Sequence, residues 1–270
     1  MKIKKVYGAF FSAYGTTKKV TSYIAKKFGD NNEMFDFVHD ARFKLYSFGE
    51  DSKKKLAINE LNSDDLLIIG MPVFSGRIPS ICEEQIKLLK GNNTPAIVLA
   101  VYGNRDYDDA ALELADLVKK QGFKVIAAGA FIAEHSIFHD VAKNRPDEKD
   151  YKKMDEFVEA CKVKIESNIE LMEELKIKGN RPYKVRGKAS LIPVGDENCI
   201  SCGACVNVCP MGAIDPANPN TTDADKCISC FACVAICPTD ARSFKSEAFI
   251  TKGKGFYKQN EARKEPEWFI

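Results

Sequence analysis

The 270-residue sequence has no apolar run of about 20 residues, the length that a membrane-spanning helix needs. It has no concentrated stripe of basic residues with interleaved aromatics, so nucleic-acid binding is not indicated. The apolar stretch near the start is interrupted by Gly8 and Gly15, and no acceptable cleavage site follows, so we expect no export signal. Neither a G-x-x-x-x-G-K-[ST] nor a G-x-G-x-x-G motif occurs, which disfavours nucleoside triphosphates and dinucleotides as ligands.

Cysteine, in contrast, is concentrated in one part of the chain. Eight of the ten cysteines form two runs of the pattern C-x-x-C-x-x-C-x-x-x-C-P, and these are Cys199, Cys202, Cys205 and Cys209, then Cys227, Cys230, Cys233 and Cys237. Three closely spaced thiolates can hold three corners of a [4Fe–4S] cluster, and the fourth is set aside for the other cluster. By this crossing rule, one cluster takes Cys199, Cys202, Cys205 and Cys237, and the second takes Cys227, Cys230, Cys233 and Cys209.

Disulfides and zinc account for these cysteines less well. A disulfide framework needs an oxidising compartment, for which we find no signal. Zinc favours pairs of C-x-x-C units, and the third and fourth cysteine of each run would then have no role. The residues 195–247 resemble the bacterial two-cluster ferredoxins, which implies a small α+β domain holding two [4Fe–4S] clusters. Oxygen-sensitive clusters and unpaired thiols indicate a reducing, cytoplasmic location.

Charge is divided unevenly along the chain. The whole sequence has a formal net charge of +2, whereas residues 195–247 carry seven acidic and three basic residues, a net of −4, which leaves about +6 for the rest. An acidic redox module beside a basic body suggests charge-guided docking within the chain or with redox partner proteins. A homodimer could also bring one subunit's clusters to the other subunit.

The first 178 residues alternate between strand and helix patterns. Continuous apolar runs predict buried parallel strands, and apolar residues at helical spacing follow them. We expect strands at 6–11, 34–38, 66–70, 96–101 and 123–133, and helices at 16–28, 79–89, 107–121 and 147–176. This count predicts an α/β fold with a doubly wound, five-stranded parallel sheet. We expect residues 179–194 to form a linker and residues 248–270 to be a tail that packs on the body.

The turn after the first strand is rich in hydroxyl groups. Ser12, Tyr14, Thr16 and Thr17 surround Gly15 at the start of the predicted helix. Backbone N–H groups and the helix dipole attract an anion there, and hydroxyls add directed hydrogen bonds, so the turn predicts a phosphate cradle. A hydroxyl-rich helix N-cap that binds nothing would have the same composition.

Two further loops leave the carboxyl ends of the third and fourth predicted strands. One contains Pro72, Val73, Phe74, Ser75 and Gly76, and the other contains Gly103, Asn104 and Tyr107. Such loops flank the point where ligands bind in open α/β sheets. Their aromatic residues are candidates for stacking on a flat ring, and their glycines allow a close approach.

With these loops in place, the chain resembles the flavodoxins. The resemblance implies that Ser12, Tyr14, Gly15, Thr16 and Thr17 hold the phosphate of FMN. It further implies that the two later loops line the two sides of the flavin ring, through Pro72, Val73, Phe74, Ser75 and Gly76 and through Gly103, Asn104 and Tyr107. The sequence departs from the flavodoxin pattern at Tyr14 and Thr16, where Thr and Asn are common.

Together, the two halves resemble the flavodoxin–ferredoxin fusion ("ferrodoxin") family of anaerobic bacteria. This resemblance implies an electron-transfer protein that passes single electrons between two [4Fe–4S] clusters and FMN. One alternative is an FMN-dependent reductase of a quinone, nitro compound or disulfide, and a second is a ferredoxin module on an FMN-free docking domain. We favour the electron carrier over an enzyme. His135 closes the last predicted strand and is a candidate proton donor, although an imidazole that only caps the strand would look the same.

Overall fold

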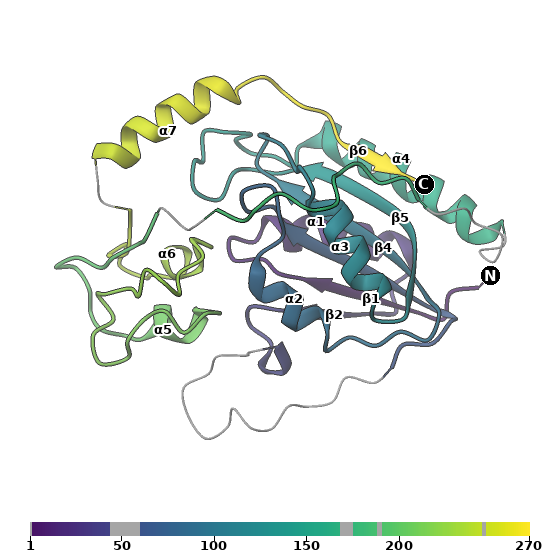
Figure 1. Ribbon diagram of the computed structural model, residues 1–270, viewed down its shortest axis with the longest axis horizontal. Coiled ribbons are helices and arrows are strands. Elements are labelled where there is room, and N and C mark those ends of the chain that lie inside the picture. The colour runs from purple at the N-terminus through teal and green to yellow at the C-terminus, as the bar shows by residue number, and fades with distance from the viewer. Residues whose placement is uncertain (1, 44–59, 168–174, 188–190, 245–246) are drawn as a thin grey trace.

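The computed structural model describes residues 2–43, 60–167, 175–187, 191–244 and 247–270 (Figure 1). Its centre is a six-stranded sheet in the order β2-β1-β3-β4-β5-β6. The strands are β1 (Lys5–Phe10), β2 (Asn32–Asp36), β3 (Asp65–Pro72), β4 (Thr94–Tyr102), β5 (Phe123–Ile132) and β6 (Glu267–Phe269). The first five strands are parallel. The order 2-1-3-4-5 is that of the flavodoxin-like doubly wound fold, so the expected fold class is confirmed.

The helices between the strands follow the sequence pattern closely. They are α1 (Thr16–Phe28), α2 (Ser80–Ile86), α3 (Ala110–Lys119) and α4 (Glu148–Glu166), with a short 3₁₀ helix, η1, at Ala41–Phe43. The predicted helix over 147–176 begins with a capping box formed by Asp147 and Asp150 and ends at Glu166, while residues 168–174 lie outside the described part of the chain. Each described helix is too short or too polar to cross a membrane.

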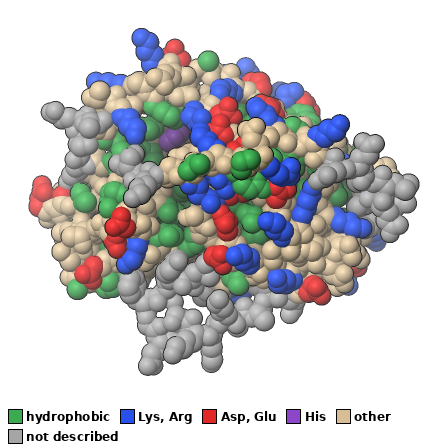
Figure 2. Space-filling view, in the orientation of Figure 1, with side chains coloured by type: hydrophobic (Ala, Val, Ile, Leu, Met, Phe, Trp, Pro, Cys, Tyr) green, Lys and Arg blue, Asp and Glu red, His purple; other side chains and the backbone are tan. Residues whose placement is uncertain are grey.

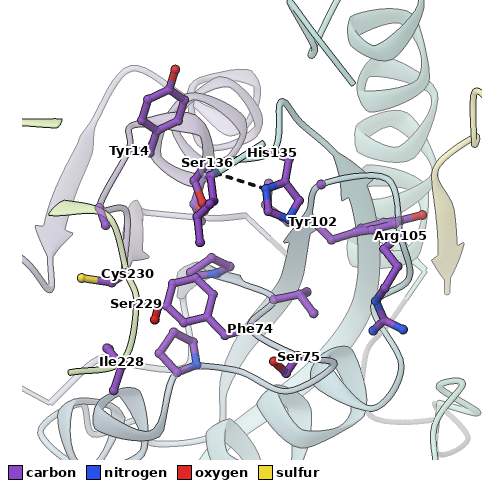
Figure 3. A pocket seen from close by; sticks show the side chains of 18 of the residues that line it. Tyr14, Phe74, Ser75, Tyr102, Arg105, His135, Ser136, Ile228, Ser229 and Cys230 are labelled. Atoms are coloured by element: carbon purple, nitrogen blue, oxygen red, sulfur yellow. Dashed lines mark hydrogen bonds between the residues drawn. The ribbon is translucent and has the colours of Figure 1, made fainter. Parts of the chain in front are cut away.

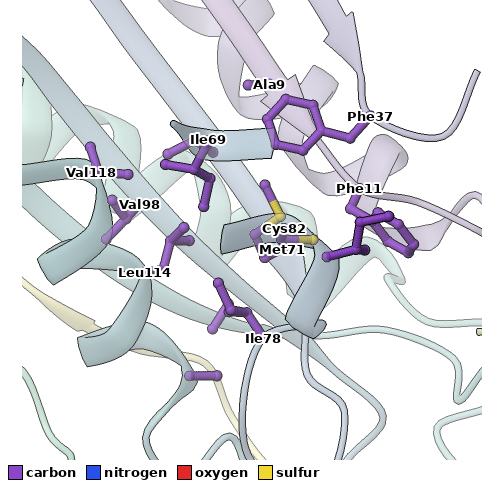
Figure 4. Packing of buried hydrophobic residues seen from close by; sticks show 14 of the residues in the cluster. Ala9, Phe11, Phe37, Ile69, Met71, Ile78, Cys82, Val98, Leu114 and Val118 are labelled. Carbon is purple, nitrogen blue, oxygen red and sulfur yellow. The ribbon is translucent and has the colours of Figure 1, made fainter. Parts of the chain in front are cut away.

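Two buried apolar layers hold the sheet between its helices. One layer joins α1 and α4 to one face, with Ile24 and Phe157 fully buried. The other joins α2 and α3 to the opposite face, and Figure 4 shows Cys82 and Leu114 packed there against strand residues such as Ile69. Because β3 and β4 are covered on both faces, their residues are almost all buried, which explains the continuous apolar runs in the sequence.

The cysteine-rich region, which we define as residues 191–244, lies beside the carboxyl ends of the strands (Figure 1). It contains the short helices α5 (Ala204–Val208) and α6 (Ala232–Ala235), which contact each other. Its backbone repeats itself after 28 residues: φ is 52° at both Ser201 and Ser229, and 73° at both Gly203 and Phe231. The two cysteine runs therefore form two loops of the same shape.

On the face in Figure 2, Lys and Arg side chains are concentrated over the sheet rather than over the cysteine-rich region.

The C-terminal tail crosses back to the sheet. Helix α7 (Glu247–Gln259) starts next to the cysteine-rich region, and β6 pairs antiparallel with β5, opposite Ala128, Gly129 and Ala130 (Figure 1). This sixth strand was not expected, because three residues of Glu-Trp-Phe carry too little periodicity to predict a strand.

A buried ion pair anchors the tail. Arg145 is 6% exposed and Asp150 1% exposed, and Arg145 donates two hydrogen bonds to the Asp150 carboxylate, one of them 2.9 Å long from Nε to Oδ2. Arg145 Nη1 also donates to the backbone oxygen of Lys264 over 3.0 Å, and Arg263 donates to Asp150 over 3.1 Å. The Asp150 carboxylate thus links the α/β core to the tail.

Replacing Asp150 with asparagine is expected to lower the free energy of unfolding by about 3–5 kcal/mol, because the buried Arg145 charge would lose its counter-charge. Urea unfolding of the purified variant measures the loss. The matched control is Glu159→Gln, since Glu159 is exposed and pairs with Lys162 within α4, and its effect should stay within about 0.5 kcal/mol. Equal effects from the two variants would contradict the assignment.

Candidate functional site

A cavity of about 390 Å³ lies at the carboxyl ends of the strands, next to the cysteine-rich region (Figure 3). Four loops of the sheet line it, after β1, β3, β4 and β5. The linker, the cysteine-rich region and α7 complete its wall, through Arg186, Gly187, Leu191, Cys227, Ile228, Ser229, Cys230, Lys252 and Phe256. In Figure 3 the loop with Ile228, Ser229 and Cys230 forms one side of the cavity, opposite Tyr102 and Arg105.

The predicted phosphate cradle forms one end of this cavity. Ser12, Thr16 and Thr17 line it, and Gly15 takes the N-cap position of α1 with φ 97°. No side chain caps α1 through Gly15, while the Ser12 hydroxyl accepts a hydrogen bond from the backbone N–H of Lys18 over 3.0 Å. A 13-residue helix whose N-cap residue is a glycine without a capping side chain fits an anionic group such as phosphate at its first turn.

Tyr14 also lines the cavity, but its hydroxyl has a protein partner. The hydroxyl donates to Glu134 Oε1 over 3.1 Å, and the ring lies 4.9 Å from the His139 ring. Burial and the Glu134 carboxylate raise the pKa of Tyr14. In Figure 3 its side chain points away from the loop with Phe74. The Tyr14 side chain is thus fixed by Glu134 and His139, and its hydroxyl already has a partner within the protein.

The loop after β3 forms the central wall. All five predicted residues of this loop line the cavity, namely Pro72, Val73, Phe74, Ser75 and Gly76. The ring of Phe74 packs edge-on against Phe11, with centroids 6.4 Å apart. Gly103, from the loop after β4, lines the opposite wall, and a Cβ atom there would lie 2.5 Å from the ring of His135. A side chain at Gly103 would therefore displace His135 from the cavity wall.

Two predicted residues of the β4 loop do not line the cavity. Asn104 is buried and donates to the backbone oxygens of Asn260 and Ala262, each over 2.8 Å. Tyr107 is 1% exposed and donates to Glu267 Oε2 over 2.7 Å. Both side chains hold the tail against the sheet, and Glu267 belongs to the unexpected strand β6. Gly15 lies at the N-cap, outside the cavity lining.

His135 lines the cavity as a neutral ring. Its Nδ1 accepts hydrogen bonds from the backbone N–H groups of Ile137 over 3.2 Å and Phe138 over 3.1 Å, which leaves the ring proton on Nε2. Burial, helped by the neighbouring His139, lowers the pKa of His135 from 6.5 to about 4. At neutral pH we therefore expect an uncharged hydrogen-bond donor at this position.

An NMR titration of the imidazole is expected to show His135 uncharged from pH 8 down to about pH 5, with its midpoint near 4. The unfolded chain binds this proton near pH 6.5, so the free energy of unfolding should fall as the pH decreases from about 6.5 to about 4. His135→Gln should remove this part of the pH dependence. A His135 midpoint near 6.5 in the folded protein would contradict the expectation.

The cysteines occupy two different environments. Cys202 is exposed, whereas Cys205 and Cys233 are each 8% exposed. Cys227 and Cys230 line the cavity, and burial raises the pKa of both thiols. The eight thiols of the two runs are free of disulfides.

Cys209 lies within electrostatic range of the second run. It raises the pKa values of Cys227, Cys230 and Cys233, as neighbouring thiols do. Backbone N–H groups point at the sulfurs, from Ala213 to Cys209 over 3.3 Å and from Ser229 to Cys227 over 3.4 Å. In the described residues, no three His, Cys, Asp or Glu side chains converge on a single ion position. A [4Fe–4S] cluster needs no such convergence, because each of its irons takes one cysteine, so the donor set fits the cluster.

An aromatic cluster joins the cysteine-rich region to the sheet. Phe231, between Cys230 and Cys233, lies edge-on to Tyr14 at 5.6 Å and to His139 at 5.4 Å, and 6.0 Å from Phe244. We call Phe231, Tyr14, His139 and Phe244 the interdomain aromatic cluster. It fixes the loop with Cys230 beside the cavity.

The linker is held on α3 by acidic side chains. Asp109 accepts hydrogen bonds from the backbone N–H groups of Asn180 over 2.8 Å and Lys184 over 2.6 Å. Arg181 donates to Asp116 over 2.8 Å, and Arg186 donates to Glu113. Sequence reasoning did not assign these linker residues to the site, because nothing local to the linker marks it as facing the cavity. The same holds for Glu134, Lys252 and Phe256, which also line the cavity.

Comparison with known families identifies the cysteine-rich region. Residues 198–241 match the family described as the 4Fe-4S dicluster domain. A search of curated protein sequences found no similar protein.

Solved structures resemble the remainder of the chain at low identity. Rubredoxin:oxygen oxidoreductase from the anaerobe Desulfovibrio gigas is 17% identical with a TM-score of 0.41, and the match covers 61% of this chain and 38% of that one. A flavodoxin of Streptococcus pneumoniae TIGR4 is 15% identical (TM-score 0.38), covering 60% of this chain and 99% of the flavodoxin. A flavoprotein from Lactobacillus acidophilus NCFM, solved in complex with FMN, is 18% identical with a TM-score of 0.32. The match covers 47% of this chain and 92% of that flavoprotein. The fold assignment rests on the strand order, since TM-scores this low do not carry it.

The chain thus joins a flavodoxin-like sheet to a 4Fe-4S domain, and the cavity lies where the two meet. This combination indicates redox electron transfer.

Proposed function

We propose that this protein is an electron carrier that binds FMN in the cavity and two [4Fe–4S] clusters in the cysteine-rich region, and that it passes single electrons between them. One observation carries the proposal. The cavity is lined on one side by the phosphate cradle and the β3 loop, and on the other by Cys227 and Cys230. Residues suited to a flavin and residues suited to an iron–sulfur cluster therefore line the same cavity.

The bound groups would supply complementary chemistry, since an iron–sulfur cluster exchanges one electron at a time and a flavin one or two. The chain supplies position and environment. The first turn of α1 and the hydroxyls of Thr16 and Thr17 would hold the phosphate of FMN. Phe74 and Gly103 would border the flavin ring, and His135 would donate a hydrogen bond through Nε2.

The two cysteine sets would have different roles. We define the first cysteine set as Cys199, Cys202, Cys205 and Cys237, and the second as Cys227, Cys230, Cys233 and Cys209. The second set borders the cavity, while the first includes the exposed Cys202 and lies next to Ile236, which is 45% exposed. The first set would thus exchange electrons with redox partner proteins and the second with the flavin.

Anaerobic purification followed by quantification of flavin, iron and sulfide tests the proposal. We expect about one FMN and about eight iron atoms per chain. If no flavin is bound even after incubation with excess FMN, the proposal fails and a ferredoxin module on a docking domain remains.

Turnover with a panel of acceptors separates the carrier from an FMN-dependent reductase. Linker and α7 residues, including Arg186 and Phe256, also line the cavity, which supports a flavin that exchanges electrons within the chain. Slow, indiscriminate reoxidation of the reduced protein is expected for the carrier. Saturable turnover of one class, such as quinones, would establish the reductase instead.

A further inference from the structure

Arg242 is a buried cation in the middle of the cysteine-rich region. It is 2% exposed. Its Nη1 donates to the backbone oxygen of Pro219, and its Nη2 donates to the hydroxyl of Thr222 and, over 3.0 Å, to the backbone oxygen of Pro193. These neutral acceptors fix the guanidinium in one place without neutralising its charge.

The same guanidinium reaches both cysteine sets. Its Nη1 lies 4.0 Å from the Sγ atom of Cys205, which belongs to the first set. Its charge also acts electrostatically on Cys227 and Cys233, both in the second set. The single positive charge of Arg242 therefore interacts with thiols of both cysteine sets.

The internal repeat shows that packing alone does not require an arginine here. The position 28 residues earlier is Ile214, which is 1% exposed, so an apolar side chain fills the equivalent place in the first half. Burying a cation is costly unless it is paired. Within the described residues no carboxylate forms an ion pair with Arg242, and its Nε is buried without a hydrogen-bond partner. The negative thiolates of the two sets are the counter-charge that remains.

We propose that Arg242 raises the reduction potentials of both [4Fe–4S] clusters. A cluster with four thiolates is negatively charged, and reduction adds one more negative charge. A fixed cation nearby, in a site that excludes water, stabilises the reduced form more than the oxidised form. The inference rests on the two clusters of the proposed function, and it does not depend on flavin binding.

Two variants of Arg242 test it in the intact protein, by redox titration monitored with EPR. Arg242→Gln removes the charge, and at a fixed ambient potential the ratio of reduced to oxidised form should fall about tenfold or more for both clusters. For a one-electron couple, a tenfold change corresponds to about 59 mV. Arg242→Lys keeps the charge, so its ratios should stay within about twofold of the wild type.

A second pair of variants keeps the arginine and its packing. Thr222→Asp places a carboxylate within reach of the guanidinium and would neutralise it in place, so both ratios should again fall. Thr222→Asn has the same shape without the charge and should leave them unchanged. If Arg242→Gln does not retain iron, the comparison of Thr222→Asp with Thr222→Asn tests whether the charge of Arg242 sets the reduction potentials.

Iron and flavin are quantified first in every preparation. A wild-type protein that lacks flavin would contradict the proposed function and leave this inference standing. Unchanged potentials in Thr222→Asp relative to Thr222→Asn would overturn the inference. So would equal shifts in Arg242→Gln and Arg242→Lys, because the effect would then come from hydrogen-bond geometry rather than charge.

Discussion

Replacing Phe231 with glycine is expected to slow electron transfer between the second cysteine set and the flavin by about 10- to 100-fold, while both clusters are retained. Transfer depends on fixed placement of the two sites, and displacements of about 1 Å can have effects of this size in other positioned reactions. Phe231 holds the loop with Cys230 against Tyr14 and His139. Without the ring, this loop loses its aromatic contacts with Tyr14 and His139.

The loop itself should tolerate the change. Phe231 has φ 73°, a left-handed conformation that costs a residue other than glycine about 1–3 kcal/mol, and the equivalent Gly203 also has φ 73°. Each lost aromatic pair costs about 0.5–1.5 kcal/mol. Glycine thus relieves strain within the loop while it weakens the contact between the two parts of the protein. The chain already builds the same loop with glycine in its first half.

The rate is measured as bleaching of flavin absorbance after rapid photochemical reduction of the clusters under anaerobic conditions. Phe231→Leu, which keeps the strained backbone but not the aromatic contacts, should also be slow. Ile236→Ala is the matched control, because Ile236 is exposed and lies outside the interdomain aromatic cluster. An unchanged rate in Phe231→Gly with full iron content would show that this cluster does not set the geometry.

Replacing Thr16 with aspartate is expected to weaken FMN binding by about 100-fold or more, equivalent to about 2.8 kcal/mol. Thr16 is the first residue of α1 and lines the cavity. A carboxylate there would repel the phosphate of FMN at close range. The same carboxylate would interact favourably with the N-terminus of the helix, by about 0.3–1 kcal/mol in the flavin-free protein.

If Thr16→Asp binds FMN more weakly but is more stable without flavin, the loss of affinity is due to charge repulsion rather than to damage of the fold. FMN affinity is measured by fluorescence quenching on titration of flavin-free protein, and stability by urea unfolding of the same sample. Thr16→Asn is the matched control, since it has the shape of aspartate without the charge, and its affinity should fall by less than about tenfold. If both variants bind equally weakly, the loss comes from shape and the cradle is not an anion site.

The parallel sheet and the iron–sulfur loops could be predicted because their signals are local. Strands such as β3 and β4 are covered on both faces, so almost every residue along them is apolar. The cysteine runs are equally local, because three ligands of one cluster must come from one tight loop. Helix α1 was predicted with its observed bounds for the same reason, since its apolar residues recur at helical spacing.

The predictions were weaker where a residue's partner is distant in sequence. Asn104 and Tyr107 were assigned to the flavin ring from their loop, and the structure instead places them against Asn260 and Glu267. Tyr14 was assigned to the cradle, and its hydroxyl donates to Glu134, 120 positions away. No pattern within a loop reveals which distant segment will pack on it.

By itself, the sequence determined that a doubly wound sheet and a cysteine-rich iron–sulfur module occur in one chain, because hydrophobic periodicity and ligand spacing are properties of short segments. Only the tertiary structure decided that Cys227 and Cys230 border the same cavity as Phe74 and the predicted phosphate cradle, and that the buried Arg242 lies 4.0 Å from the sulfur of Cys205. Those placements depend on Phe231, the linker and β6, whose contacts join residues that are far apart in the chain. The choice among such long-range contacts is made by the packing of the whole molecule.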